Sequence, residues 1–195
     1  MGSDYIIRTG NKGDEPVVGA LMALAFASDP FVRWILPDPN VYVQGSMKHA
    51  ANTAPESFVD GHVHIIGRNY GAIVWVPPGN EIHRNDPENG DGSDAGGRTT
   101  AELGELIKQS EVYYPDEPYW YLAWVAVDPM WRGKGLGTAL LKHTLDICDQ
   151  SHQPAYLEST NAANLSIYER HGFELLAEVQ VGNSPKRYPM LRPAR

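Results

Sequence analysis

The sequence has almost no cysteine and no membrane-length apolar run, and each shortage excludes a class of protein. Its 195 residues include a single cysteine, Cys148, so no disulfide can form within the chain. No apolar stretch approaches the roughly 20 residues that a transmembrane helix needs. The N-terminus also lacks the basic, apolar and small-residue regions of a signal peptide. We therefore expect a cytoplasmic protein with no membrane partner.

Basic residues are scarce as well. The chain has 16 Lys and Arg against 24 Asp and Glu, a formal net charge of -8. This charge provides no basic surface for a phosphate backbone, so we expect no nucleic-acid partner. An acidic surface attracts cationic amines, although it is also a common way to stay soluble. With 42% hydrophobic residues the chain can bury one core, and we expect a single domain over residues 1–195.

Hydrophobic periodicity and turn residues predict a mixed α/β domain without internal repeats. The predicted helices cover residues 16–26, 41–58, 99–107, 135–150 and 162–171. The predicted strands cover residues 5–8, 62–66, 72–76, 122–127, 155–159, 173–181 and 186–191. Asp29-Pro30 is expected to end the first helix. Residues 79–98 have almost no apolar side chains and predict a mobile loop within the domain.

The most informative segment joins a predicted strand to a predicted helix through Arg132-Gly133-Lys134-Gly135-Leu136-Gly137. Three alternate glycines let the backbone approach a ligand, and the free N–H groups at a helix start favour an anion such as a pyrophosphate. The P-loop pattern is absent, and the Rossmann pattern fails because Thr138 or Leu140 stands where its third glycine should be. Taken alone, the glycines are equally compatible with a plain turn.

This segment resembles the acetyl-CoA loop of the GNAT acetyltransferase superfamily, which has the form R/Q-x-x-G-x-G/A after a V-x-V strand. The matching positions are Val125-Ala126-Val127, Pro129, Arg132, Gly135 and Gly137. A second motif follows at the expected distance, because residues 161–173 (NAANLSIYERHGF) resemble the family's N…Y-E-x-x-G-F block. Two motifs in the right order favour the family over a plain turn.

Within the superfamily, the chain is most similar to puromycin N-acetyltransferase-like small-molecule acetyltransferases. The stretches that carry this similarity are residues 25–30, 74–78, 120–123 and 157–173. The similarity is specific from about Glu117 onward. Residues 79–112 and the acceptor-facing half fit poorly, and these parts would select the substrate.

The resemblance implies the GNAT fold: a twisted, mostly antiparallel sheet of six or seven strands, splayed beside the cofactor, with helices on both faces. It also implies acetyl-CoA as cosubstrate and direct attack of an amine on the thioester. We expect no metal, because His62 and His64 share a strand face without further placed ligands. The backbone of Val125, Ala126 and Val127 would pair with the pantetheine amides. The pyrophosphate would be held by Arg132, Gly133, Lys134, Gly135, Leu136 and Gly137. Asn161 and Asn164, which match motif asparagines, are further cofactor-binding candidates.

Tyr168 matches the family tyrosine that protonates the departing CoA sulfur, so we expect it to be catalytic. A phenol with an ordinary pKa of about 10 stays protonated at neutral pH, as a general acid requires. The general base is left open. The strand before the glycine-rich loop contains no acidic residue, so a chain of water molecules is one alternative. Glu158, His62 and His64 are others, and each is equally compatible with a structural role.

The sequence leaves the acceptor undetermined. Five aromatic residues are candidates for an acceptor pocket or for ordinary core packing: Trp34, Trp75, Trp120, Tyr121 and Trp124. We expect an N-acetyltransferase that acts on the primary amine of a small molecule. The alternatives are acetylation of a protein lysine or N-terminus, and a CoA-binding sensor without turnover. A homodimer is also left open.

Overall fold

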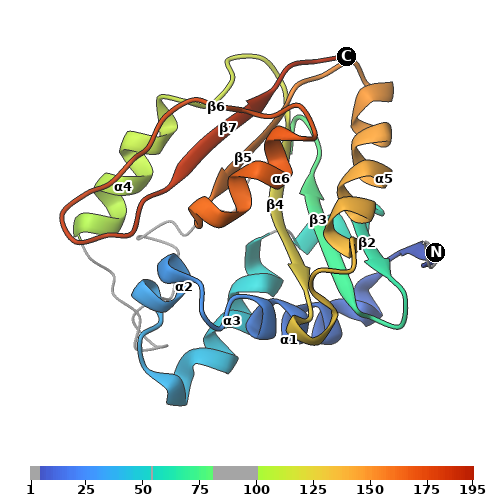
Figure 1. The fold of residues 1–195 in the computed structure, drawn as a ribbon, viewed down its shortest axis with the longest axis horizontal. Coiled ribbons are helices and arrows are strands. Elements are labelled where there is room, and N and C mark those ends of the chain that lie inside the picture. Colours follow the sequence, from blue (N-terminus) through green and yellow to red (C-terminus); the bar gives the residue numbers. More distant parts are fainter. Residues whose placement is uncertain (1–4, 54, 81–100) are drawn as a thin grey trace.

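The computed structural model describes residues 5–53, 55–80 and 101–195. The strands of this part of the chain form one seven-stranded sheet in the order β1-β2-β3-β4-β5-β7-β6 (Figure 1). They are β1 (Ile7–Thr9), β2 (Val63–Ile66), β3 (Gly71–Val76), β4 (Trp120–Val127), β5 (Ala155–Ser159), β6 (Glu174–Leu175) and β7 (Tyr188–Arg192). Neighbouring strands are antiparallel except β4 and β5, which run parallel.

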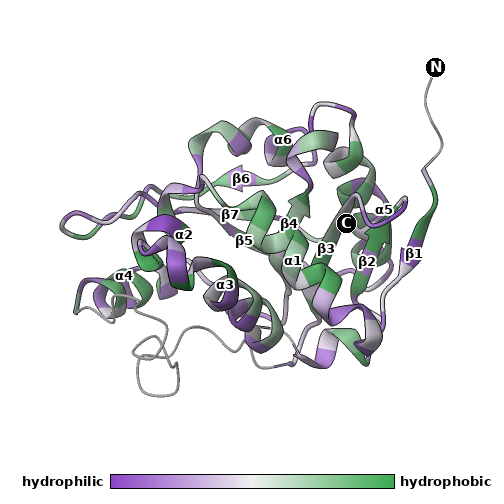
Figure 2. Ribbon diagram, turned by 90° about the horizontal axis from the view of Figure 1, so that it is seen from below, coloured by the Kyte–Doolittle hydropathy of each residue, from purple (hydrophilic) through white to green (hydrophobic). Residues whose placement is uncertain are grey.

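Helices cover both faces of this sheet. They are α1 (Glu15–Ala25), α2 (Pro30–Ile35), α3 (Pro39–Thr53), α4 (Ala101–Glu111), α5 (Leu136–Gln150) and α6 (Leu165–Glu169). One core cluster packs Val18 of α1 and Ala50 of α3 against one face, and another packs Leu140 of α5 against the other. Because the central strands are buried on both faces, β2 and β3 are mostly hydrophobic, as the green along them shows in Figure 2, with His64 a buried polar exception. The mixed, mostly antiparallel sheet is the one that the sequence predicted.

The first helix ends where the sequence predicted, but a helix that was not predicted follows it. Phe26 closes α1, and Asp29 then occupies the N-cap of α2. The Asp29 carboxylate accepts hydrogen bonds from the backbone N–H groups of Phe31 and Val32, both at 3.0 Å. Pro30 suits the first helical position because its missing N–H would have no partner there. The interpretation of Asp29-Pro30 as a plain helix stop was therefore incomplete.

Strand β4 carries an irregularity and then separates from β5. Val74 pairs with Trp124 and Trp75 pairs with Leu122, so Ala123 is an extra residue that forms a β-bulge. On its other side, β4 pairs with β5 only at Trp120↔Ala155 and Tyr121↔Tyr156. Beyond these two pairs the strands diverge, as Figure 1 shows, while β5 stays paired with β7 along its whole length. The predicted splay of the sheet lies here.

The other differences from the predicted elements are at boundaries. The helix expected over 41–58 is α3 followed by the 3-10 turn Pro55–Phe58. The strand expected over 173–181 is only β6 and an isolated bridge at Val179. Leu176 donates to the Pro189 carbonyl at 2.9 Å, but Pro189 has no N–H to return the bond, so the ladder stops. The expected loop over 79–98 lies, from residue 81 on, outside the described residues.

Candidate active site

The turn after β4 presents backbone N–H groups at the start of a long helix. Gly133 and Gly135 have φ angles of 74° and 80°, a left-handed conformation that glycine adopts without strain. Gly135 is the N-cap of α5, and no side chain in the described part of the chain caps it. A Cβ atom added at Gly133 or Gly135 would meet no described atom within 4 Å. The free N–H groups and the helix dipole therefore face open space that suits an anion.

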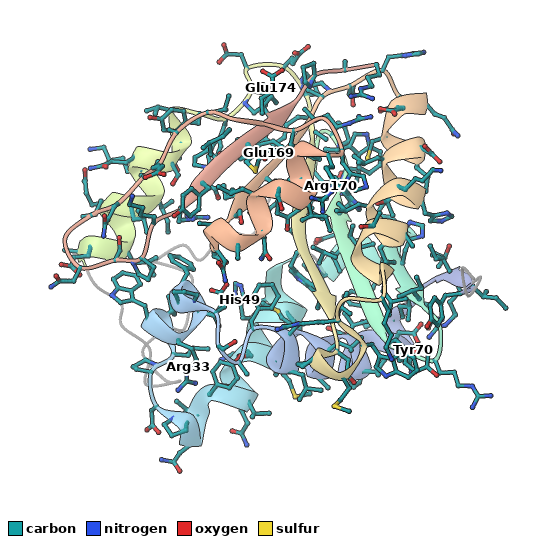
Figure 3. All side chains as sticks on the ribbon, viewed as in Figure 1. Arg33, His49, Tyr70, Glu169, Arg170 and Glu174 are labelled. Atoms are coloured by element: carbon teal, nitrogen blue, oxygen red, sulfur yellow. The ribbon has the colours of Figure 1, made fainter. Side chains whose placement is uncertain are left out.

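Side chains hold this turn against the neighbouring hairpin. Asp128 accepts a 2.8 Å hydrogen bond from the Met130 N–H, and its own N–H donates to the Tyr70 carbonyl at 2.9 Å. The Trp131 ring stacks on Tyr70 with centroids 3.7 Å apart, and the Lys134 ammonium lies 4.0 Å above the Trp131 ring. Figure 3 labels Tyr70 at the end of the hairpin. The turn is thus fixed by contacts that leave its glycines exposed.

Arg132 contacts the N-terminal helices. Its guanidinium donates a hydrogen bond to the Ala25 carbonyl, in the last turn of α1. Carbonyls in a last helical turn have no partner within the helix, so a cation is favourable there. The sequence led us to expect Arg132 beside a pyrophosphate. In this structure it joins the glycine-rich turn to α1.

Tyr168 lies on α6, next to the start of α5. A Cβ added at Gly137 would lie 3.6 Å from Ile167 Cδ1 and 3.9 Å from Val127 Cγ2, so the end of β4, the start of α5 and α6 converge. Tyr168 is 8% exposed, and its ring packs edge-on against Phe173 with centroids 6.1 Å apart. Burial raises the pKa of Tyr168 to about 12, and the negative charge of Asp29 adds to the rise. The phenol is therefore protonated at neutral pH.

Both motif asparagines lie in the turn between β5 and α6. The Asn161 side chain accepts a 3.0 Å hydrogen bond from the Ala163 N–H and so caps the short 3-10 helix Ala162–Asn164. Asn164 is exposed at the N-cap position of α6. The structure thus brings both residues to the base of the Tyr168 helix.

The three base candidates separate into two places. His62 and His64 lie toward the α5 face, where their rings are 5.2 Å from Trp120 and His143 respectively. Glu158 is on the opposite face: it alternates with Leu157 along β5 and lies beside Tyr156, whose hydroxyl is 3.5 Å from its carboxylate. Its side chain is 1% exposed and forms an ion pair with Arg187.

The ion pair is enclosed by aromatic rings at the point where β4 and β5 separate. Tyr156 contacts the rings of Tyr114, Tyr119 and Tyr121 at centroid distances of 5.3, 5.8 and 6.3 Å. The Arg187 guanidinium lies 5.1 Å from the ring centre of Phe31 on α2. We call these residues the fork cluster: Phe31, Tyr114, Tyr119, Tyr121, Tyr156, Glu158 and Arg187. The carboxylate of Glu158 holds the pKa of Arg187 above its ordinary value despite burial, so the guanidinium stays charged.

The five aromatic residues named from sequence do not form one pocket. Tyr121 and Trp124 belong to the core beneath α1 and α3. Trp75 and Trp120 belong to the core beneath α5, and Trp34 packs near α4. Alternation along each strand sends neighbouring residues to opposite faces of the sheet. Sequence reasoning instead missed Asp29, Tyr156 and Arg187, because their environment depends on contacts between distant segments.

Two properties of the described residues concern metals and membranes. No group of three or more His, Cys, Asp or Glu in this part of the chain could hold a metal ion. Among the helices of residues 5–53, 55–80 and 101–195, none has the length and apolar character to cross a bilayer.

Comparisons with known proteins point to the same region of the chain. Residues 97–173 match the family model described as "Acetyltransferase (GNAT) family". A stretch of 75 residues is 35% identical to an uncharacterized N-acetyltransferase of Schizosaccharomyces pombe. That stretch covers 38% of this chain and 30% of the yeast protein, so the chain spans about a third of the length of this curated relative.

Solved structures extend the likeness to nearly the whole chain. One is titled histone acetyltransferase HPA2 and related acetyltransferase, from Corynebacterium glutamicum. It has a TM-score of 0.70 and 23% identity, over 98% of this chain and 97% of that one. Arylalkylamine N-acetyltransferase 2 from Aedes aegypti has a TM-score of 0.67 and 12% identity, over 99% of this chain and 100% of that one. At these identities the likeness is evidence for the fold alone, and the predicted GNAT fold is confirmed.

Proposed function

From the match of residues 97–173 to the model of the GNAT acetyltransferase family, we propose that the protein transfers an acetyl group from acetyl-CoA to the primary amine of a small molecule. The cofactor would enter from the α5 face. Its pyrophosphate would bind the N–H groups of the turn from Arg132 to Gly137. Its pantetheine would pair with the backbone of Val125, Ala126 and Val127, beside the turn that carries Asn161 and Asn164.

The observation that carries this proposal is the convergence of three features around Gly137. The open backbone of β4, the uncapped start of α5 and the Tyr168 helix meet there. The first can bind an amide chain, the second an anion, and the third supplies a protonated phenol. A CoA thioester needs all three, because it combines a pyrophosphate, two amides and a leaving thiolate.

The acceptor would approach from the opposite face of the sheet, at the point where β4 and β5 separate. The fork cluster offers aromatic rings at the last residue pair before the strands separate, with the buried Glu158–Arg187 ion pair beside them. Aromatic surfaces suit the apolar body of an amine and can also contact its cationic form. These features support a small amine as the acceptor.

Two glycines with matching backbones provide the first test. Gly135 and Gly79 have φ angles of 80° and 86°, and neither has a described neighbour within 4 Å of an added Cβ. Leucine therefore strains the backbone equally at both positions. Calorimetric titration with acetyl-CoA should show affinity at least about tenfold weaker in Gly135→Leu, because the side chain occupies the anion site. Gly79→Leu should bind like the wild type. Equal affinity in all three proteins would contradict the pyrophosphate assignment.

A thiol-release assay over a panel of amines is the second test. The panel contains arylalkylamines, polyamines, lysine peptides and peptides with a free N-terminus. We expect the highest kcat/KM with a small amine. A preference for peptides would identify a protein acetyltransferase. Tight acetyl-CoA binding without turnover on any acceptor would identify a CoA-binding sensor.

A further inference from the structure

The Glu158–Arg187 ion pair is the charged centre of the fork cluster, and the proposed reaction gives it so far no role. Glu158 lies two positions beyond Tyr156, the last β5 partner of β4, so it is at the point where the two strands have separated. The Arg187 guanidinium donates a hydrogen bond to this carboxylate and lies 5.1 Å from the ring centre of Phe31. The pair therefore connects β5 with α2 across the acceptor side of the sheet.

The carboxylate is the inaccessible half of the pair. The Glu158 side chain is 1% exposed, whereas the Arg187 side chain is 12% exposed. Both carboxylate oxygens already face a donor: Oε2 accepts from the guanidinium, and Oε1 lies 3.5 Å from the Tyr156 hydroxyl. A ligand cation could reach Glu158 only by displacing Arg187, and the two cations would repel each other.

A second buried carboxylate beside the pair is engaged as well. Asp29 lies two residues before Phe31, and its residue is 7% exposed. Its Oδ1 accepts the N–H groups at the start of α2, and its Oδ2 accepts a 2.7 Å hydrogen bond from the hydroxyl of Thr160, two residues after Glu158. An additional ammonium group on an acceptor would therefore find both carboxylates already bound to donors of the protein.

We propose that Arg187 is a specificity-determining residue: by neutralising Glu158 where β4 and β5 separate, it excludes acceptors with a second cationic group and restricts the reaction to monoamines with an apolar body. This inference rests on the proposed function, since it places the acceptor on this side of the sheet. Discrimination of this kind comes from a repulsive element directed against the wrong substrate. The net charge of -8 attracts every cationic amine alike, so the choice between amines falls to local charges such as this one.

Stability alone does not account for the pair. Two apolar side chains of similar volume are often as stable in a protein interior as a buried ion pair. The rings of Tyr156 and Phe31 already provide an apolar environment at this point. A charged pair among these rings is what the proposed discrimination requires.

Four variants separate the charge of Arg187 from its volume. Arg187→Ala removes the guanidinium and leaves space for a ligand cation beside Glu158. Glu158→Gln/Arg187→Ala has the same space without the negative charge and is the matched control. Arg187→Lys keeps the positive charge. Arg187→Gln loses the charge but keeps an amide that can donate to the carboxylate, so it serves where the alanine variant is too unstable to assay.

Two isosteric amines measure the discrimination: hexylamine, and the diamine in which an ammonium replaces its terminal methyl. Where another monoamine is the better substrate, that amine and its analogue with an added ammonium take their place. The wild type should have a kcat/KM at least about tenfold higher for the monoamine. In Arg187→Ala and Arg187→Gln this ratio should fall at least about tenfold, because the second ammonium can pair with Glu158. The double variant and Arg187→Lys should stay near the wild-type ratio.

A second measurement needs neither acetyl-CoA nor turnover. Ethylguanidinium reproduces the end of the arginine side chain, and ethylurea is its uncharged counterpart. At millimolar concentration, ethylguanidinium should raise the Tm of Arg187→Ala by about 2–5 °C, because it binds the folded protein beside Glu158. Ethylurea should not raise it, and ethylguanidinium should leave the wild type and the double variant unchanged. An equal response in the single and double variants would overturn the inference, as would no response in Arg187→Ala.

The kinetic outcomes distinguish failure of this inference from failure of the proposed function. A wild type that acetylates the monoamine and the diamine equally, or prefers the diamine, would overturn the role of Arg187 and leave the function standing. A wild-type ratio in both Arg187→Ala and Arg187→Gln would do the same. A wild-type protein that binds no acetyl-CoA and acetylates no small amine would instead contradict the function, and this inference with it.

Discussion

The glycine-rich turn and the fork cluster are built in opposite ways. The turn is one continuous segment, exposed, and offers mainly backbone N–H groups. The fork cluster is buried, drawn from distant segments, and offers side chains only. A short sequence pattern can therefore specify the turn, whereas no local pattern specifies the cluster. This is the physical reason that a family motif identifies an acetyl donor far more readily than an acceptor.

The largest expected effect is at Tyr168, which lies on α6 next to the glycine-rich turn and apart from the fork cluster. Tyr168→Phe should lower kcat by about 10²- to 10⁴-fold, because the leaving thiolate loses its proton donor. Acetyl-CoA affinity, measured by calorimetry, should change less than about twofold, since the ring and its contact with Phe173 remain. An unchanged kcat would contradict the role of Tyr168 as the proton donor.

The next effect tests whether the fork cluster depends on its side chains. Glu158→Gln leaves the Arg187 cation buried without its partner and should lower the free energy of unfolding by about 3–5 kcal/mol. The double variant Glu158→Gln/Arg187→Met should recover much of that loss. Urea unfolding of the wild type, both single variants and the double variant measures the coupling. Additive losses would show that the two charges act independently.

A smaller effect is expected in the turn, because its ligand groups are backbone atoms. Trp131→Leu removes the ring that stacks on Tyr70 and lies beneath the Lys134 ammonium. The backbone N–H groups proposed to bind the cofactor stay in place. Acetyl-CoA affinity should fall only about three- to tenfold, as expected for loss of one aromatic pair. Calorimetric titration measures it. A loss of acetyl-CoA affinity as large as that in Gly135→Leu would mean that side chains, and not backbone N–H groups, dominate binding at the glycine-rich turn.

The smallest effect is at His64, which belongs to neither region. Burial lowers the pKa of His64 to about 4 from an ordinary 6.5, with His143 and His62 adding to the shift. Between these pH values His64 is protonated in the unfolded chain but neutral in the folded protein. Stability is therefore full above pH 6.5 and falls as the pH drops toward 4. His64→Leu should show a smaller loss of urea midpoint between pH 7 and pH 4.5, with kcat unchanged at pH 7.5.

Elements that depend on local pattern were predicted well. The hairpin of β2 and β3, strand β5 and helix α5 agree with their predicted positions within a residue or two. The short helix α2 was missed because Asp29-Pro30 is equally a signal for the end of one helix and the start of another. The bulge at Ala123 could not be predicted, because the residues of β4 have the hydrophobic pattern of an ordinary buried strand.

The same distinction applies to the site. The turn, Asn161, Asn164 and Tyr168 belong to two continuous motifs, so the sequence named them, and their roles stay predictions. Arg187 was not predictable, because its environment needs β5 and α2 packed around it. Asp29 was read as a backbone signal because its bond to Thr160 spans 131 residues.

The two residue pairs between β4 and β5 have a further consequence. In the described residues they are the whole backbone ladder joining strands β1–β4 to strands β5–β7. On the proposed function, acetyl-CoA lies along the part of β4 that β5 leaves unpaired, and it supplies the backbone hydrogen-bond partners that a neighbouring strand would otherwise supply. Bound cofactor would then slow amide exchange along β4 and strengthen the sheet against mechanical separation. The lifetime of the folded protein would follow the concentration of its own cosubstrate.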